Sequence, residues 1–302
     1  MAAKVGVSWR GQGDPSVHLR SRLCALGLKG VLEKSLKIDG SGLRSQRYVV
    51  GVAASSIAEW QLTDLLAYCK TPYAVAVSAL ERRREASTIG VGQDGDWEGG
   101  NRRLYLEYWQ RVAAVNSANR ADLSDVGNAP LLTVCAKRLP GVHVMDAWKW
   151  QPSRMGEWYE SRYYVFPGLN REESFAVFAD HTQTTLTLGS GSAGLRSLLA
   201  ELSGNQDPSY CAQLWSAWDL DQESNLLARQ TLDLNILDFE MPAQRLHGIT
   251  PEICAAFPAA AAQWHHWLER LSATKAIVSH LAAGIDRQGG AYFCLYYLDG
   301  AD

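Results

Sequence analysis

Arginine and tyrosine side chains recur two residues apart in strand-like segments of this sequence. Arg103 precedes Tyr105 and Glu107, and Arg162 precedes Tyr164. Side chains two residues apart share one face of a β-strand, so each segment presents a cation and a phenol to the same side. If these faces converge inside a barrel, they form a cationic, hydroxyl-rich patch ringed by aromatic side chains.

A further strand-like segment places Asp233 and Asn235 on one face. For any single strand, an arginine on a solvated outer face is an equally good interpretation. The recurrence of the pattern across several strands favours the interior of a barrel.

Five strand-like runs carry these residues, and their starts lie 56, 59, 69 and 60 residues apart. They are Arg47–Val52, Arg103–Trp109, Arg162–Phe166, Thr231–Leu237 and Ala291–Leu298. Amphipathic stretches predict helices before or after them: Val17–Ser35, Ile57–Cys69, Glu172–Asp180, Leu195–Leu202 and Pro251–Leu271. The spacing indicates repeated supersecondary units. Alternating polar and apolar residues in the strands indicate an antiparallel sheet with one polar face.

Composition limits the classes of protein that this sequence can encode. Its 302 residues carry a net charge of −3, from 29 basic and 32 acidic residues, which argues against a general nucleic-acid binder. The six cysteines are widely spaced and support neither a disulfide framework nor a zinc site. Without a signal peptide or an apolar span of about 20 residues, we expect a cytoplasmic monomer that binds no membrane. Without a linker-like tract, we expect residues 1–302 to form a single domain.

Three other motifs have residue types found in nucleotide-binding or metal-binding sites. The segment Gly189–Gly194 (GSGSAG) matches GxGxxG between a strand-like TTLTL and a helix-like LRSLLAEL. A glycine-serine turn is the favoured interpretation, but a nucleotide-binding oxidoreductase stays an alternative function, as does a non-catalytic barrel that binds an aromatic ligand. The pair His265–His266 lacks a third metal ligand, and Asp219–Glu223 (DLDQE) is too sparse for an aspartate-rich metal–diphosphate motif.

The segment Leu32–Val52 reads LEKSLKIDGSGLRSQRYVVGV and carries the residues Glu33, Ser35, Lys37, Ile38 and Arg47. In its residue types and spacing this segment resembles the cyanobactin peptide prenyltransferases, which have the ABBA prenyltransferase architecture. In that family a helix-end segment bears the glutamate, and a strand that opens with the arginine follows. The closing segment AAGIDRQGGAYFCLYYLDG and the strand with Arg103 and Tyr105 are similar to later elements of the same family.

The resemblance implies an α+β fold in which five αββα repeats form a barrel of ten antiparallel strands with helices outside. It implies transfer of an isoprenyl group from an allylic diphosphate, geranyl or dimethylallyl, to a tyrosine, tryptophan, arginine or histidine side chain of a ribosomal peptide, cyclic or linear. Mg²⁺ is expected to accompany the diphosphate, with few protein ligands.

The resemblance also implies roles for particular residues. Glu33 would be the general base. The residues expected to bind the diphosphate and the prenyl chain are Arg47, Arg103, Arg162, Tyr105, Tyr164, Tyr297, Asn235, Ala217 and Trp218. Of the two residues expected at the end of the prenyl pocket, Ala217 would admit a ten-carbon donor and Trp218 would limit the donor to five carbons. We favour Ala217.

Three residues depart from the family pattern. Glu107 stands where a further cation would help to bind the diphosphate, and Asp233 and Asn235 stand where the family more often has aromatic rings. The carboxylates of Glu107 and Asp233 could bind a cationic acceptor such as an arginine guanidinium. The identity of the acceptor side chain is therefore open at this stage.

Overall fold

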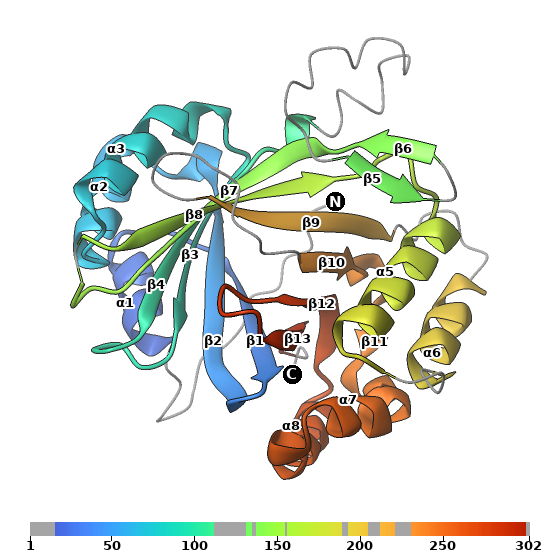
Figure 1. Ribbon diagram of the computed structural model, residues 1–302. Helices are drawn as coiled ribbons and strands as arrows, with labels where there is room; N and C mark the ends of the chain where they lie inside the picture. The colour runs from blue at the N-terminus through green and yellow to red at the C-terminus, as the bar shows by residue number, and fades with distance from the viewer. Residues whose placement is uncertain are drawn as a thin grey trace.

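A closed antiparallel barrel is the centre of the molecule (Figure 1). The computed structural model describes residues 16–111, 131–134, 137–154, 156–188, 193–204, 212–220 and 231–299. Within these residues, ten strands pair in the order β10-β9-β8-β7-β4-β3-β2-β1-β13-β12, and pairing of β12 with β10 closes the ring. The strands are β1 (Val31–Asp39), β2 (Gly42–Ala53), β3 (Thr88–Asp94), β4 (Asn101–Glu107), β7 (Val142–Trp150), β8 (Trp158–Val165), β9 (Gln213–Leu220), β10 (Thr231–Asn235), β12 (Ile277–Ile285) and β13 (Ala291–Leu298).

Three short strands lie outside this ring. β11 (Met241–Pro242) pairs with the start of β12, and β5 (Leu131–Val134) forms a separate hairpin with β6 (Lys137–Pro140). A closed ring leaves no long unpaired edge that could pair with another chain.

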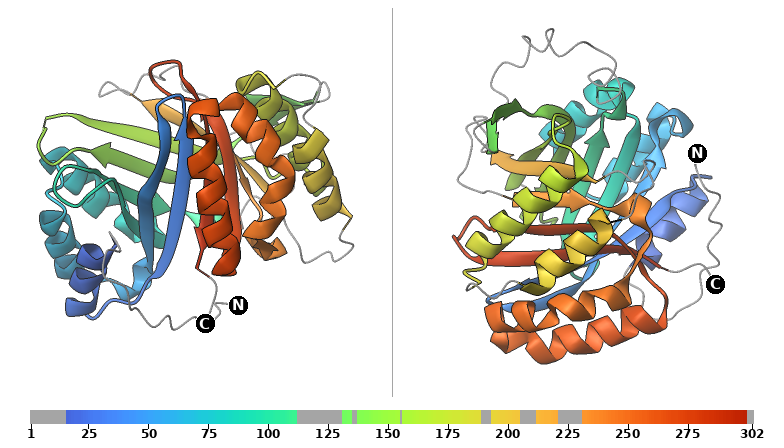
Figure 2. Two further views of the ribbon diagram at one scale, coloured as in Figure 1. Left: turned by 90° about the horizontal axis from the view of Figure 1, so that it is seen from below. Right: turned by 90° about the vertical axis from the view of Figure 1, so that its right-hand side faces the viewer.

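Helices cover the outside of the barrel, as the two views of Figure 2 show. They are α1 (Val17–Ala25), α2 (Glu59–Tyr68), α3 (Tyr73–Arg82), α5 (Arg171–Thr185), α6 (Ala193–Ser203), α7 (Thr250–Ala256) and α8 (Ala261–Ala273). Short 3₁₀ segments occupy Ala54–Ser56, Arg83–Glu85, Leu237–Phe239, Ala243–Ile249 and Pro258–Ala260. Within the described ranges, each helix is too short or too polar to serve as a bilayer-crossing segment.

Strand alternation separates an apolar outer face from a polar lumen. On β4, Leu104 and Leu106 are fully buried in the apolar layer between the barrel and helices α1 to α3. On the opposite side of the barrel, Phe293 of β13 packs in the same way against Trp264 of α8, with ring centroids 6.1 Å apart. The alternate residues of each strand therefore face the lumen.

The predicted fold class is confirmed, and each of the five strand-like runs lies largely within a barrel strand. The predicted helix Val17–Ser35 is wrong in its second half. α1 ends at Ala25, Gly27 takes a positive φ of 70°, and the chain then enters β1. Glu33 therefore lies on a strand instead of a helix end.

The context expected for the GxGxxG match is also wrong. α5 continues to Thr185, where a strand was expected, and residues 189–192 lie outside the described residues. At the start of α6, the backbone N–H groups of Gly194 and Leu195 already donate to the carboxylate of Glu252. Because a dinucleotide site needs a strand before its loop and a free helix N-terminus, the oxidoreductase alternative is not supported.

Candidate active site

A cluster of cationic side chains lies on adjoining strands inside the barrel. Arg47 of β2, Arg103 of β4 and Lys149 of β7 surround Asp94 of β3. Lys37 of β1 completes this cationic cluster, since its charge acts on Lys149 and its Nζ lies 3.6 Å from Asp39. Asp94 lies 2.8 Å from Nη2 of Arg103, 3.5 Å from Nε of Arg47 and 3.6 Å from Nζ of Lys149. Strand register brings them together: Arg47 pairs with Asp94, and Arg103 pairs with Lys149.

The cationic cluster has more positive charge than Asp94 can balance. Burial alone would raise the pKa of Asp94, but Arg47, Arg103 and Lys149 hold it well below its usual range. Burial and the charge of Arg103 lower the pKa of Lys149 to about 7, while burial and the charges of Arg44 and Arg47 lower that of Lys37 to about 8.

Two guanidinium donors in the same cluster lack a hydrogen bond. The Nε atoms of Arg47 and Arg103 are buried without a hydrogen-bond acceptor among the described residues, and that of Arg47 has only the ion pair with Asp94 at 3.5 Å. An anion with several oxygens, such as a diphosphate, would supply both the missing acceptors and the missing negative charge.

A second group of charged residues lies inside the barrel. Glu33 of β1, Glu107 of β4, Asp233 of β10 and His280 of β12 form this acidic cluster. Glu33 accepts a hydrogen bond from the Ser279 hydroxyl, and its Oε1 lies 3.1 Å from Nδ1 of His280.

Burial and neighbouring charges shift the pKa values of three residues in the acidic cluster. Burial alone would lower the pKa of His280, but the charges of Glu33 and Asp233 raise it to about 9. Burial raises the pKa of Asp233 to about 6, against the opposing charge of His280. Burial likewise raises the pKa of Glu107, whose Oε2 accepts a hydrogen bond of 2.8 Å from the Trp109 indole.

Aromatic rings line the acidic cluster. The ring of His280 lies 6.4 Å from that of Trp215 and 5.8 Å from that of Tyr296, and Trp109 lies 5.2 Å from Trp215. Tyr296 interacts electrostatically with both Arg47 and Asp233, so it lies between the two clusters. Burial raises the pKa of Tyr296 well above its usual value, which keeps the phenol protonated.

Small residues face these rings from the other strands. Gly90 of β3 and Ala147 of β7 pair with Tyr105, and Ala217 of β9 pairs with Tyr163. A Cβ atom at Gly90 would come within 3.2 Å of Tyr105 Cβ. The lumen wall therefore combines large rings with positions that lack a side chain beyond a methyl group.

The structure brings several predicted site residues to the lumen. The residues that lie on the lumen-facing side of their strands are Glu33, Arg47, Arg103, Tyr105, Ala217 and Asn235. Arg103 donates a hydrogen bond of 3.2 Å to the Tyr105 hydroxyl. Asn235 uses its Oδ1 locally, because this atom accepts a hydrogen bond from the backbone of Leu237.

The expected lumen positions of Arg162 and Tyr164 are wrong. On β8 the inward residues are Ser161 and Tyr163, since Ser161 pairs with Ala147. Arg162 points outward, where its Nε lies 3.2 Å from Glu160 and 3.9 Å from Asp146.

Tyr297 and Trp218 also face away from the lumen. Tyr297 is buried in the apolar layer under the helices, while its neighbour Tyr296 faces inward. Trp218 points outward and donates a hydrogen bond of 2.9 Å to the Ser216 hydroxyl. At the expected end of the prenyl pocket, Ala217 is therefore the inward residue.

Sequence reasoning missed Asp94, Lys149, Tyr296 and His280 as site residues. The segment Val142–Trp150 (VHVMDAWKW) alternates in its second half, which is a strand signal that could have placed Lys149 beside Ala147 on one face. Asp94 follows the glycine-rich run TIGVGQ, in which no charged side chain marks a lumen face.

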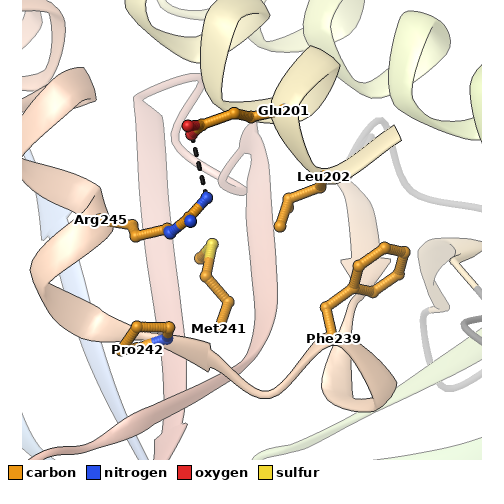
Figure 3. A pocket seen from close by; sticks show the side chains of 6 residues that line it. All are labelled: Glu201, Leu202, Phe239, Met241, Pro242 and Arg245. Atoms are coloured by element: carbon orange, nitrogen blue, oxygen red, sulfur yellow. Dashed lines mark hydrogen bonds and ion pairs between the residues drawn. The ribbon is translucent and has the colours of Figure 1, made fainter. Parts of the chain in front are cut away.

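A separate cavity of about 190 Å³ lies outside the barrel (Figure 3). It is lined by Glu201 and Leu202 of α6 and by Phe239, Met241, Pro242 and Arg245. Glu201 and Arg245 neutralise each other across it at 3.0 Å. None of its lining residues belongs to either charged cluster.

Comparison with known proteins rests on structure, because no protein-family model and no curated protein matches the chain. One similar structure is a 5-dimethylallyl tryptophan synthase from Streptomyces coelicolor, solved in complex with DMASPP and Trp. Its TM-score is 0.53 at 11% identity, over 89% of this chain and 79% of that one. AnaPT from Neosartorya fischeri has a TM-score of 0.50 at 13% identity, over 90% of this chain and 79% of that one.

This chain has the ABBA prenyltransferase fold. At 11% and 13% identity the likeness establishes the fold alone. Within the ABBA architecture, the resemblance to the cyanobactin peptide prenyltransferases stays a prediction.

The low pKa of Lys149 predicts proton uptake when an anion binds. At about pH 8 the Lys149 amine is mostly neutral, and a bound diphosphate would favour its charged form. In Lys149→Arg the side chain is already charged, so we expect the variant to take up fewer protons, by up to about one. Affinity of the parent should also fall more steeply than that of the variant as the pH rises from about 7 to 9.

Calorimetry with inorganic diphosphate in two buffers of different ionisation enthalpy measures the proton uptake. Protons that the diphosphate itself exchanges are common to both proteins and cancel in the difference. Equal uptake by parent and variant would show that Lys149 does not contact the anion.

Proposed function

We propose that the protein transfers a prenyl group from an allylic diphosphate to a nucleophilic side chain of a peptide. The observation that carries the proposal is the cationic cluster, which has buried guanidinium Nε donors without a hydrogen bond and lies among aromatic side chains of the lumen. The fold agrees with this proposal. The peptide acceptor rests on the resemblance of the Glu33–Arg47 segment.

The cationic cluster would bind and stabilise the departing diphosphate. As the bond between the allylic carbon and the bridging oxygen breaks, its electron pair goes to the diphosphate. Arg47 and Arg103 would donate to the phosphate oxygens through the Nε atoms that lack a hydrogen bond. Lys37 and Lys149 would regain their full charge beside the anion, because a nearby negative charge favours the protonated amine.

Aromatic side chains between the two clusters would protect the allyl cation. Tyr105 and Tyr296 face the lumen next to the cationic cluster. Their ring faces attract a cation, and they exclude water that would otherwise capture it. The protonated hydroxyl of Tyr296 also offers a donor to the developing charge on the diphosphate.

Glu33 would accept the proton that the acceptor loses as the new bond forms. Ser279 and His280 of β12, the strand beyond β13, contact the Glu33 carboxylate across the lumen face. The charges of Glu33 and Asp233 raise the pKa of His280 to about 9, so a positively charged imidazole lies beside Glu33 at neutral pH.

Magnesium binding by the protein itself does not fit the described residues. No group of three or more carboxylate, histidine or cysteine side chains among them is arranged to hold a metal ion. Asp94, the carboxylate inside the cationic cluster, is already engaged by Arg47, Arg103 and Lys149. We derive no step through Mg²⁺, and an ion that enters with the diphosphate stays a prediction of the resemblance.

The decisive assay combines dimethylallyl or geranyl diphosphate with a peptide panel and detects prenylated products by mass spectrometry. Arg103→Ala should weaken binding of a non-ionisable thiolodiphosphate analogue roughly 10- to 100-fold, because a charge-assisted hydrogen bond contributes about 1.5–3 kcal/mol. Calorimetry provides the affinity.

Arg162→Ala is the matched control for Arg103→Ala, since it removes the same charge from the outer face of the barrel. It should leave the affinity for the analogue unchanged. An equal loss in both variants, or in neither, would place the diphosphate elsewhere. Ligand binding by the parent with no diphosphate release would favour a non-catalytic barrel.

Glu33→Gln tests the proton acceptor. The amide keeps the shape of the side chain but cannot take up a proton, so we expect kcat for peptide prenylation to fall by about 10²- to 10⁴-fold. Affinity for the thiolodiphosphate analogue should stay near that of the parent. A variant that turns over at the parental rate would exclude Glu33 as the base.

Ala217→Phe tests the length of the prenyl pocket. Ala217 is fully buried and faces the lumen, and each buried CH₂ of a longer donor contributes about 0.8 kcal/mol. We therefore expect the parent to prefer the ten-carbon donor and Ala217→Phe to prefer the five-carbon donor, as measured by kcat/KM. Trp218→Phe is the control on the outer face, and it should keep the parental preference. A ten-carbon preference that survives in Ala217→Phe would refute this role.

A further inference from the structure

The acidic cluster contains a buried acceptor atom that no residue of the described ranges satisfies. Asp233 is only 9% exposed, and its Oδ1 has no hydrogen-bond partner. A buried polar atom without a partner costs roughly 1–3 kcal/mol. In a lumen that binds substrates, such an atom points to a ligand that brings a donor.

The charge of the cluster defines that ligand more closely. Glu33, Glu107 and Asp233 outnumber the single cation His280 among the described residues of this cluster. Their negative charges act on His280 from three strands, and three carboxylates exceed the one positive charge of His280. A ligand that carries both positive charge and N–H donors would relieve the repulsion and the unsatisfied acceptor together.

A metal ion does not suit this place. The described residues contain no group of three or more potential ligands at metal-binding geometry, although three carboxylates and a histidine are present here. Oxygen atoms of Glu33 and Glu107 are also directed at Ser279 and Trp109, respectively. Two of the three carboxylates are thus oriented by N–H and O–H donors on different strands, which suits a ligand that brings N–H donors.

The aromatic surroundings favour a planar cation. The rings of Trp215 and Tyr296 flank His280, and Trp109 extends the same wall toward Glu107. A guanidinium is flat, stacks on ring faces and has five N–H donors that can reach carboxylates on different strands. An ammonium group is compact and strongly hydrated, and it uses fewer of these features.

We propose that the acidic cluster binds the guanidinium of an arginine side chain in the acceptor, and that a nitrogen of this guanidinium receives the prenyl group. The binding part stands on the acidic cluster alone, and the transfer part rests on the proposed function. Asp233 Oδ1 accepts one N–H of the guanidinium, Glu107 supports the opposite edge, and Glu33 faces the reacting nitrogen.

The transfer step balances with these groups. One N–H proton of the guanidinium goes to Glu33, because a protonated guanidinium has no lone pair available for attack. The nitrogen then forms a bond to the allylic carbon, whose bond to the diphosphate oxygen has broken. The product is a prenylated guanidinium that keeps one positive charge, and Glu33 later returns its proton to water.

Binding can be tested without any prenyl donor. Trp109 and Trp215 lie at the cluster, so their fluorescence reports on an occupant. The probes are Nα-acetyl-arginine amide, the lysine analogue and the uncharged citrulline analogue, which keeps the planar shape. We expect the arginine probe to bind at least tenfold more tightly than either of the others. Equal binding of the citrulline or lysine probe would overturn the assignment of a guanidinium.

Variants locate the site. Asp233→Asn and Glu107→Gln should each weaken binding of the arginine probe by tenfold or more, and either one suffices if the other does not fold, as judged by circular dichroism. Asp238→Asn changes the net charge equally on the exposed segment after β10 and should bind as the parent does. Parental affinity in both cluster variants would overturn the proposal.

Transfer is scored separately from binding. Fragmentation of a prenylated peptide that contains both arginine and tyrosine should place the prenyl group on the arginine. Prenylation of tyrosine alone would overturn this inference and leave prenyl transfer intact. Arginine binding without transfer from any donor would overturn the proposed function and the transfer step, and it would leave the guanidinium site standing.

Discussion

Repulsion among the lumen cations is the constraint on which the rest of the lumen depends. Arg47, Arg103 and Lys149 share the carboxylate of Asp94, while Lys37 lies beside them with its Nζ 3.6 Å from Asp39. Asp94 offsets part of the repulsion, but burial and the charge of Arg103 still lower the pKa of Lys149 to about 7. Binding of an anion would therefore be coupled to protonation of Lys37 and Lys149.

In the proposed reaction, the two charged clusters would divide the lumen into a donor side and an acceptor side. Tyr296 stands between them, in electrostatic contact with Arg47 on one side and Asp233 on the other. An allyl cation formed at the cationic cluster would be repelled by the arginines there and attracted toward the carboxylates. The field inside the barrel would therefore help to separate the cation from its diphosphate.

Much of this arrangement could be predicted from strand alternation, and its errors have a common cause. Alternation showed which residues share a face, so Arg103, Tyr105 and Glu107 were placed together correctly. It does not show which face is inside, because both faces of a barrel strand are buried here, one under helices and one around the lumen. Arg162 has polar partners on the outer face, and nothing in its own segment distinguishes these from lumen partners.

Other features depended on contacts between strands that are distant in sequence. The sequence assigns Glu33 to a helix, because the apolar spacing of α1 continues into β1. The partners that give Glu33 its setting, Ser279 and His280, lie more than 240 residues away. Only closure of the barrel brings them together.

The glycines of β3 lie where the lumen wall has little space for a side chain. A side chain at Gly92 would collide with the Tyr48 carbonyl at 2.6 Å, which is backbone and cannot yield. At Gly90 a methyl group would lie 3.2 Å from Cβ of Tyr105 and from Cγ2 of Val49, so these side chains would have to shift by a few tenths of an ångström. New substrate ranges would therefore arise by exchanging residues on β7 and β9, while the wall formed by β3 would stay constant as the chain diversified.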